Sequence, residues 1–237
     1  MAAPRPRVTL TVRDLLVSTP RTRRLRLGPM ARPFPFEPGQ AALVGAYGQT
    51  ERRPYSFASS PGDVERERCL EFLIQLLDDG VLAGPHLEGI GAGSLVDVDG
   101  PIGTLGRGAD AGVPVLLVAG GTGIAPLRSI LRDLLEHGGG PTPRLVYCAR
   151  TRSELAYRDE LQNLSAKGRL GLTLTTTREW APGTDGSGRV SRELLASHLT
   201  DAATMCYVCG SVAFVNHVTG LLDTLGVPVD RVKSEAY

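Results

Sequence analysis

The first half of the chain alternates short apolar runs with turn-forming residues. β-Type runs lie between residues 7 and 98, and clusters such as Pro61-Gly62-Asp63 interrupt them. Several short strands at this spacing predict an antiparallel sandwich or a small barrel. We expect a six-stranded antiparallel β-barrel, with candidate strands 7-RVTLTVRDLL, 23-RRLRL, 41-AALVGAY, a strand starting near Arg53, 69-CLEFLIQLL and 95-LVDVD.

From Val113 onward the pattern becomes one of alternating strands and helices. The run 113-VPVLLVA is apolar throughout, as in a strand that is buried on both faces of a sheet. Apolar residues between 127 and 135 then recur at the spacing of one helical face, which predicts a helix over 126–137. Further strands are expected at 144-RLVYCA, 170-LGLTLTTT, 204-TMCYVC and 231-RVKSEAY, with helices near 153–164, from Ser191, and ending near Gly226.

This alternation predicts an α/β unit with a five-stranded parallel sheet, right-handed crossovers and flanking helices. The change of pattern falls in 103-GTLGRGADAG-112. We therefore expect two domains, residues 1–107 and residues 108–237.

Composition and charge narrow the range of functions. The 237 residues carry a net charge of +1, which gives no general reason to expect nucleic-acid or membrane binding. No apolar run reaches the roughly 18 residues of a membrane span, so we expect a cytoplasmic protein. Eight arginines against the single acid Asp14 lie between Met1 and Phe36. They form either a solvated surface or a docking face for an acidic partner or phosphorylated ligand.

The four cysteines, Cys69, Cys148, Cys206 and Cys209, match neither a zinc site nor an iron–sulfur cluster. Cys206 and Cys209 are spaced as CxxC, but they lie in an apolar strand-like run, where a redox pair is not expected. No metal site is predicted. The four histidines lack a surrounding nucleophile motif, which disfavours hydrolases and transferases.

A glycine-rich turn, 118-VAGGTGIAP, joins an apolar strand to the amphipathic helix. Gly121 and Gly123 would let a diphosphate approach the helix N-terminus, and Pro126 fits the first helical turn. Pro126 stands where a dinucleotide fingerprint has its third glycine. Taken alone, the motif indicates either nucleotide binding or a tight strand-to-helix turn.

An ordered set of motifs makes the chain resemble the ferredoxin–NADP⁺ reductase superfamily over nearly its whole length. Phe36-x-Pro38-Gly39-Gln40 is similar to the F-x-P-G-Q turn of that family, and Arg53-Pro54-Tyr55-Ser56 to its flavin-binding R-x-Y-S. The other matching segments are 70-LEFLIQLLDDGVLAGPHL, 100-GPIGTL, 120-GGTGIAP, 153-SELAYRDEL, 177-TREW, 188-GRV, 209-CGS and 235-EAY.

The resemblance implies that the barrel binds FAD. Arg53 would contact the FAD diphosphate, Tyr55 would pack beside the flavin next to Pro54, and the Ser56 hydroxyl would approach flavin N5. The backbone N–H groups of residues 82–84 (Leu82, Ala83 and Gly84) would support the diphosphate. Relatives carry Ser or Thr at the position of Ala83, so loss of one hydrogen bond is expected to weaken FAD by about 1 kcal/mol. FMN therefore remains an alternative to FAD as the bound flavin.

The resemblance also implies a nicotinamide nucleotide site in the second domain, formed around Gly121, Thr122, Gly123 and Pro126. Arg150 and Arg178 suit a 2′-phosphate, which favours NADPH over NADH without excluding NADH, and Tyr157 could stack on the adenine. Cys209, with Gly210 after it, would lie beside nicotinamide C4, and Glu235 would lie nearby. Tyr237 would cover the flavin face and swing away from it, so its deletion is expected to change nicotinamide binding.

The leading functional prediction is an FAD-dependent NADPH reductase that serves a small acidic carrier such as ferredoxin or flavodoxin. The alternatives are an NADH-dependent reductase component of an oxygenase, a free-flavin reductase, or a non-enzymatic flavin-binding electron-transfer subunit. The chain contains no ferredoxin module, so any iron–sulfur centre is expected on another polypeptide.

Overall fold

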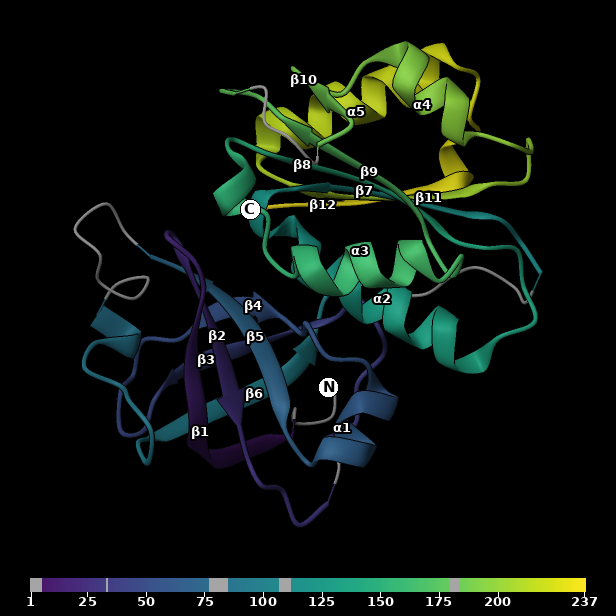
Figure 1. Cartoon of the computed structure of the whole chain (residues 1–237). Helices are drawn as coiled ribbons and strands as arrows, with labels where there is room; N and C mark the ends of the chain where they lie inside the picture. The colour runs from purple at the N-terminus through teal and green to yellow at the C-terminus, as the bar shows by residue number, and fades with distance from the viewer. Residues whose placement is uncertain (1–5, 33, 77–84, 107–111, 180–183) are drawn as a thin grey trace. The chain divides into compact units, whose positions relative to one another are not determined.

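The structure is a computed structural model that describes residues 6–32, 34–76, 85–106, 112–179 and 184–237. The chain divides into two compact units (Figure 1). The first comprises Met1–Arg107 together with Arg128–Asp133, and the second comprises Gly108–Leu127 together with Leu134–Tyr237.

The first unit is built on a six-stranded antiparallel sheet with the strand order β4-β3-β6-β1-β2-β5. Its two edge strands meet where Phe57 bridges to Phe72 and where the Ala58 N–H donates to the Glu71 carbonyl at 2.8 Å, which closes the sheet into a barrel. The predicted six-stranded antiparallel fold is thus confirmed. The strands are β1 (Arg7–Thr19), β2 (Thr22–Leu27), β3 (Ala41–Ala46), β4 (Arg53–Ser56), β5 (Leu70–Gln75) and β6 (Leu95–Ile102).

Alternating apolar side chains of these strands fill the interior of the barrel. In β1 and β2 the inward residues Val12 and Leu25 are almost fully buried, and the rings of Phe57 and Phe72 lie 5.2 Å apart between their centroids. Burial of each such side chain contributes about 1.5–3 kcal/mol to the stability of the fold. The period-two pattern of the sequence reflects this inward and outward alternation.

A short helix, α1 (Pro61–Glu67), lies where the sequence pattern indicated only a turn. The Ser60 hydroxyl accepts a hydrogen bond from the Asp63 N–H, and the Asp63 carboxylate accepts one from the Ser60 N–H, each at 3.1 Å. This is a capping box, and Pro61 occupies the first helical position, where its missing N–H is not needed. The Pro-Gly-Asp cluster therefore begins a helix.

The second unit contains a parallel sheet with the strand order β10-β9-β8-β7-β11-β12. The five longer strands confirm the predicted parallel sheet. The sixth, β10, has only two residues, which pair with Thr175 and Thr176 and are too few to produce a sequence pattern. The strands are β7 (Val115–Gly120), β8 (Arg144–Ala149), β9 (Gly171–Thr176), β10 (Gly186–Ser187), β11 (Met205–Gly210) and β12 (Val232–Ala236).

Helices cover both faces of this sheet, with α2 and α3 on one face and α4 and α5 on the other (Figure 1). The predicted helix near 153–164 is instead a 3₁₀ turn followed by α3, because Tyr157 adopts a left-handed conformation between them. The helices are α2 (Ile124–His137), α3 (Arg158–Ala166), α4 (Arg192–His198) and α5 (Val212–Thr224), and the 3₁₀ turns are η1 (Pro85–Leu87), η2 (Gly121–Gly123), η3 (Arg152–Glu154) and η4 (Val229–Arg231). Among the described residues, no helix is long and apolar enough to cross a membrane.

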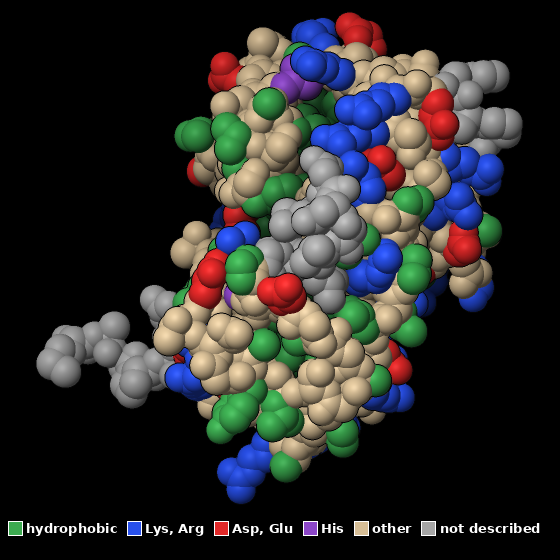
Figure 2. All heavy atoms as spheres, turned by 90° about the vertical axis from the view of Figure 1, so that its left-hand side faces the viewer, with side chains coloured by type: hydrophobic (Ala, Val, Ile, Leu, Met, Phe, Trp, Pro, Cys, Tyr) green, Lys and Arg blue, Asp and Glu red, His purple; other side chains and the backbone are tan. Residues whose placement is uncertain are grey.

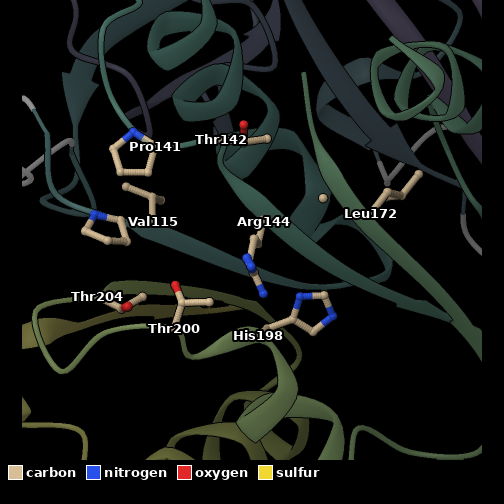
Figure 3. A pocket seen from close by; sticks show the side chains of 10 residues that line it. Val115, Pro141, Thr142, Arg144, Leu172, His198, Thr200 and Thr204 are labelled. Carbon is tan, nitrogen blue, oxygen red and sulfur yellow. The ribbon is translucent and has the colours of Figure 1, made fainter. Parts of the chain in front are cut away.

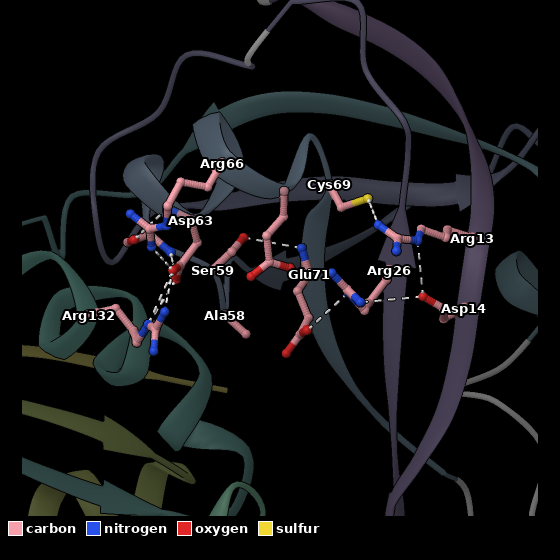
Figure 4. A network of polar contacts seen from close by, with 12 residues as sticks. Arg13, Asp14, Arg26, Ala58, Ser59, Asp63, Arg66, Cys69, Glu71 and Arg132 are labelled. Atoms are coloured by element: carbon pink, nitrogen blue, oxygen red, sulfur yellow. Dashed lines mark hydrogen bonds and ion pairs between the residues drawn. The ribbon is translucent and has the colours of Figure 1, made fainter. Parts of the chain in front are cut away.

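The middle of α2 belongs to the first unit through a polar network (Figure 4). Arg128 donates to the Ala58 carbonyl at 2.6 Å and Ser129 donates to the Ser59 carbonyl at 2.8 Å. Arg132 binds both carboxylate oxygens of the buried Asp63. Burial favours neutral Asp63, but the hydrogen bonds from Arg132 and the Ser60 N–H outweigh it and hold the pKa of Asp63 below its usual value.

Candidate functional site

The motif Arg53-Pro54-Tyr55-Ser56 forms the whole of β4, an edge strand of the first unit. Pro54 is tolerated there because an edge strand leaves one row of N–H groups without a ladder partner. Tyr55 pairs with Ala42 and Ser56 with Ala41 on β3. Arg53 and Pro54 are exposed, while Tyr55 and Ser56 are half-buried. The strand therefore presents a cation beside a partly accessible phenol and hydroxyl.

Arg53 has a partner that the sequence reading overlooked. Its Nε lies 3.0 Å and its NH2 2.8 Å from the Glu51 Oε1 atom, and both side chains are about half exposed. The spacing of Glu51 and Arg53 could have indicated this contact, because side chains two residues apart on an extended chain point to the same side. A diphosphate that binds Arg53 must compete with this carboxylate.

Tyr55 has a second partner that the sequence reading overlooked. Its hydroxyl lies 2.8 Å from the Nε2 atom of His86, which follows the predicted diphosphate segment in the chain. Burial raises the pKa of Tyr55 to about 12, so its phenol keeps its proton at neutral pH. The residues predicted to support the diphosphate, Leu82, Ala83 and Gly84, lie outside the described residues.

In the second unit, the glycine turn forms η2 between β7 and α2. Gly121 has a φ of +56°, a conformation that favours glycine. A Cβ atom at Gly123 would lie 2.2 Å from the Cys209 carbonyl oxygen, so only glycine allows η2 to approach β11 this closely. Thr122 is half-buried, and Pro126 is buried in the first turn of α2. These positions explain why the turn contains glycine and where it lies.

Tyr237 lies against this turn. Its hydroxyl donates to the Gly120 carbonyl at 2.8 Å and accepts from the Gly123 N–H at 3.0 Å, while its own N–H donates to the Gly210 carbonyl. The residue as a whole is 57% exposed, but burial of its hydroxyl raises the pKa of Tyr237. A Cβ atom at Gly121 would lie 3.5 Å from the Tyr237 hydroxyl. Tyr237 therefore lies within hydrogen-bonding distance of the backbone of this turn.

Cys209 and Glu235 are register partners on the neighbouring strands β11 and β12. Burial, and then the charge of Glu235, raises the pKa of Cys209 to about 12. Burial also raises the pKa of Glu235 above its usual range. Cys209 is therefore a neutral thiol at physiological pH, which suits contact or positioning and does not suit nucleophilic attack.

The sequence also gave no indication that Tyr147 would bond to the backbone of the glycine turn. Tyr147 is fully buried in β8, its hydroxyl donates to the Gly121 carbonyl and it accepts from the Ala156 N–H, both at 3.1 Å. Burial keeps its pKa far above the usual value. The segment 144-RLVYCA was predicted only as a strand, so nothing marked this tyrosine as polar support.

The predicted phosphate arginines come together at the end of β8. The Arg178 N–H donates to the Arg150 carbonyl at 2.9 Å, and both residues are exposed. A carboxylate also lies here, since the Arg152 N–H donates to Glu179 at 2.5 Å. Tyr157 is 8% exposed and offers little ring surface to an adenine. Figure 2 shows Lys and Arg side chains beside one another in the upper half of the view, with single acidic side chains among them.

A cavity of about 350 Å³ lies elsewhere in the second unit (Figure 3). Val115, Arg144 and Leu172, at the amino ends of β7, β8 and β9, line it, as does His198. Parallel sheets bind ligands at the carboxyl ends of their strands, where η2 and Cys209 lie. The cavity is therefore separate from the candidate nucleotide site. Within the described parts of the chain, no cluster of three potential metal ligands occurs.

Comparison with known proteins identifies the family. Residues 117–220 match the model of the oxidoreductase NAD-binding domain. The chain is 31% identical to the reductase component of propane 2-monooxygenase from Mycolicibacterium goodii, over 94% of this chain and 66% of that protein. It is 30% identical to ferredoxin–NADP reductase B of Sorangium cellulosum, over 86% of both chains.

The fold matches solved structures as well. A ferredoxin–NADP⁺ reductase from Neisseria gonorrhoeae, solved with bound FAD and NADP, superposes with a TM-score of 0.80 at 22% identity, over 97% of this chain and 98% of that chain. The chain spans about two thirds of the length of the oxygenase reductase components that it matches. With its barrel, its parallel sheet and these relatives, the chain belongs to the ferredoxin–NADP⁺ reductase superfamily of flavin- and NAD(P)-dependent oxidoreductases.

Proposed function

We propose that this protein transfers hydride from NADPH to a bound FAD and passes the electrons to a small carrier such as a ferredoxin or flavodoxin. The observation that carries the proposal is the grouping of the η2 turn, Cys209 and Tyr237 at the carboxyl ends of β7, β11 and β12. Strand ends of this kind are where parallel α/β sheets bind nucleotides. The flavin supplies the hydride-accepting chemistry, and the protein supplies orientation and exclusion of water.

The residues of β4 fit an FAD. Arg53 offers an exposed guanidinium to a diphosphate, the phenol of Tyr55 offers a flat apolar face, and Ser56 offers a hydroxyl at the end of the strand. A guanidinium forms paired, charge-assisted hydrogen bonds with phosphate oxygens. FAD and NADP are both bound in the Neisseria reductase that shares this fold, which supports the choice of cofactors.

On the second unit, the nicotinamide would pack near Cys209 and Glu235, and its diphosphate would take the N–H groups of η2. Binding there requires the Tyr237 hydroxyl to give up the Gly123 N–H. Arg150 and Arg178 carry exposed guanidinium groups on adjoining backbone segments, which favours a 2′-phosphate and hence NADPH.

A second candidate is the NADH-dependent reductase component of an oxygenase. The match to the propane 2-monooxygenase reductase component favours it, as does the carboxylate of Glu179 next to the arginine pair. Carboxylates near this strand end bind a ribose diol and disfavour a 2′-phosphate. The choice between NADPH and NADH separates the two candidates.

Anaerobic titration of the FAD-reconstituted protein with NADPH and with NADH tests both candidates by bleaching of the flavin. We expect Arg150→Ala to raise the KM for NADPH by about 10- to 100-fold, because the change removes one charge-assisted hydrogen bond to the 2′-phosphate. The KM for NADH should stay nearly unchanged. Arg158→Ala is the matched control, because Arg158 lies at the start of α3 and pairs with Asp159. Equal effects of Arg150→Ala on both nucleotides would remove the phosphate assignment, and a protein that binds no flavin would overturn the function.

A further inference from the structure

Tyr55 and His86 form a side-chain pair that the predicted flavin contacts do not include. The Tyr55 hydroxyl lies 2.8 Å from His86 Nε2, and the two rings stack with centroids 5.8 Å apart and an interplanar angle of 23°. Both residues belong to the first unit, Tyr55 on β4 and His86 on η1. The hydrogen bond fixes the position of the Tyr55 hydroxyl, and the ring stacking fixes the plane of the phenol.

His86 is fully buried, whereas Tyr55 is half-buried and packs in part against the core of the first unit. The imidazole of His86 is 0% exposed, and among the described residues its Nδ1 atom is buried without a hydrogen-bond partner. Tyr55 is half-buried on an edge strand, between the exposed Arg53 and the half-buried Ser56. The hydrogen bond and the ring contact with His86 therefore act together on the orientation of the Tyr55 ring.

The pair can form a hydrogen bond only in certain protonation states. A neutral imidazole nitrogen accepts the phenol proton, or an N–H on Nε2 donates to the phenol oxygen. Burial, with the nearby charge of Arg53 adding to it, lowers the pKa of His86, so the imidazole is neutral at physiological pH. A neutral, stacked, hydrogen-bonded partner holds the phenol without adding a charge beside it.

We propose that His86 is a positioning residue of the flavin site, which sets the plane of the Tyr55 phenol against which the isoalloxazine packs. The inference rests on the proposed function, because it assigns Tyr55 to the flavin. Aromatic stacking depends strongly on the angle and offset of the rings. A phenol released from His86 samples other side-chain rotamers, and flavin binding must then pay for restoring the productive one.

The experiment is a double-mutant cycle on flavin binding to the apoprotein. Tyr55→Phe removes the hydrogen bond and leaves His86 in place, and His86→Phe removes it while leaving an aromatic ring. We expect each single change to weaken FAD by about 3- to 10-fold, the range for one lost hydrogen bond. The double variant should bind no more weakly than the weaker single variant, because the two residues act as one unit. His86→Gln, which keeps a hydrogen-bonding group, should recover part of the loss.

A second measurement separates positioning from folding. Visible circular dichroism of the bound flavin reports the asymmetry of its surroundings, and we expect its band shape to change in His86→Phe and to return toward wild type in His86→Gln. His198→Phe is the matched control, since His198 bonds to Thr173 in the other unit and should change neither the dichroism nor the FAD affinity. Thermal unfolding of each apoprotein shows whether the variant is folded.

The outcomes distinguish this inference from the proposed function. Additive effects in the cycle, or His86 variants that lower only the melting temperature and keep wild-type affinity and dichroism, would overturn the positioning role while wild-type flavin binding stands. A folded wild-type protein that binds no flavin would overturn the proposed function and this inference together. Coupled losses with an altered flavin spectrum would support both.

Discussion

Neutralising Glu51 should tighten the binding of FAD. The Arg53 guanidinium is bonded to Glu51, with its Nε and NH2 atoms at 3.0 and 2.8 Å from the same carboxylate oxygen. A diphosphate that recruits Arg53 must displace this carboxylate or accept a shared guanidinium. Glu51→Gln removes the competing charge and keeps the size and shape of the side chain.

The solvent exposure of the Arg53–Glu51 ion pair determines how large the change in FAD affinity should be. The two side chains are 48% and 47% exposed, and exposed ion pairs contribute about 0.2–1 kcal/mol. Because about 1.4 kcal/mol corresponds to a tenfold change in affinity, Glu51→Gln should lower the Kd for FAD by up to about fivefold. The gain should shrink at high salt, because the Debye length falls to about 3 Å at 1 M ionic strength.

Quenching of flavin fluorescence by the apoprotein measures this effect. Riboflavin, which lacks phosphate, should bind wild type and Glu51→Gln equally, because only the diphosphate competes with Glu51. Glu65→Gln is the matched control, an exposed glutamate on α1 in the same unit. Equal tightening of FAD and riboflavin would refute the competition, and weaker FAD binding would show that Glu51 holds Arg53 in the productive position.

Three further predictions concern Asp97, Tyr237 and Cys209. Asp97→Asn should lower the free energy of unfolding by about 2–4 kcal/mol in denaturant titrations, because the buried carboxylate accepts from Arg7, Arg52 and Thr9 at 2.6, 2.9 and 2.7 Å. Burial opposes ionisation of Asp97, but these hydrogen bonds lower its pKa. The stability advantage of wild type over Asp97→Asn should therefore be present above pH ~4 and be lost as the pH falls through the lowered pKa of Asp97. A stability advantage that persists in acid would contradict this reasoning. Tyr237→Phe should tighten NADP⁺ binding about 2- to 10-fold in calorimetry by freeing the Gly123 N–H, whereas weaker binding would mean that the hydroxyl contacts the nucleotide. Cys209, with its pKa raised to about 12, should react with iodoacetamide at pH 8 only after unfolding, and rapid labelling of the folded protein by mass spectrometry would contradict the buried thiol.

The strands and the amphipathic helices could be predicted from the sequence because their signals are local. The period-two runs of the barrel and the apolar run that became β7 report burial of the residues themselves. The motif order likewise pointed to Arg53, Tyr55 and the η2 glycines. The sequence signals failed where one local pattern has two outcomes, as at Pro61-Gly62-Asp63, where a capping box turned a turn signal into α1.

Contacts between distant residues were decided only by the tertiary structure. Tyr237 reaches a turn more than 110 residues earlier in the chain, His86 reaches Tyr55 from a separate 3₁₀ turn, and Tyr147 donates to the Gly121 carbonyl from β8. The sequence determined which chemical groups this protein has and the two architectures that carry them. Their partners, and so their ionisation and their freedom to bind a ligand, depend on chain segments that periodicity and spacing cannot bring together, because those patterns report only neighbours along the chain.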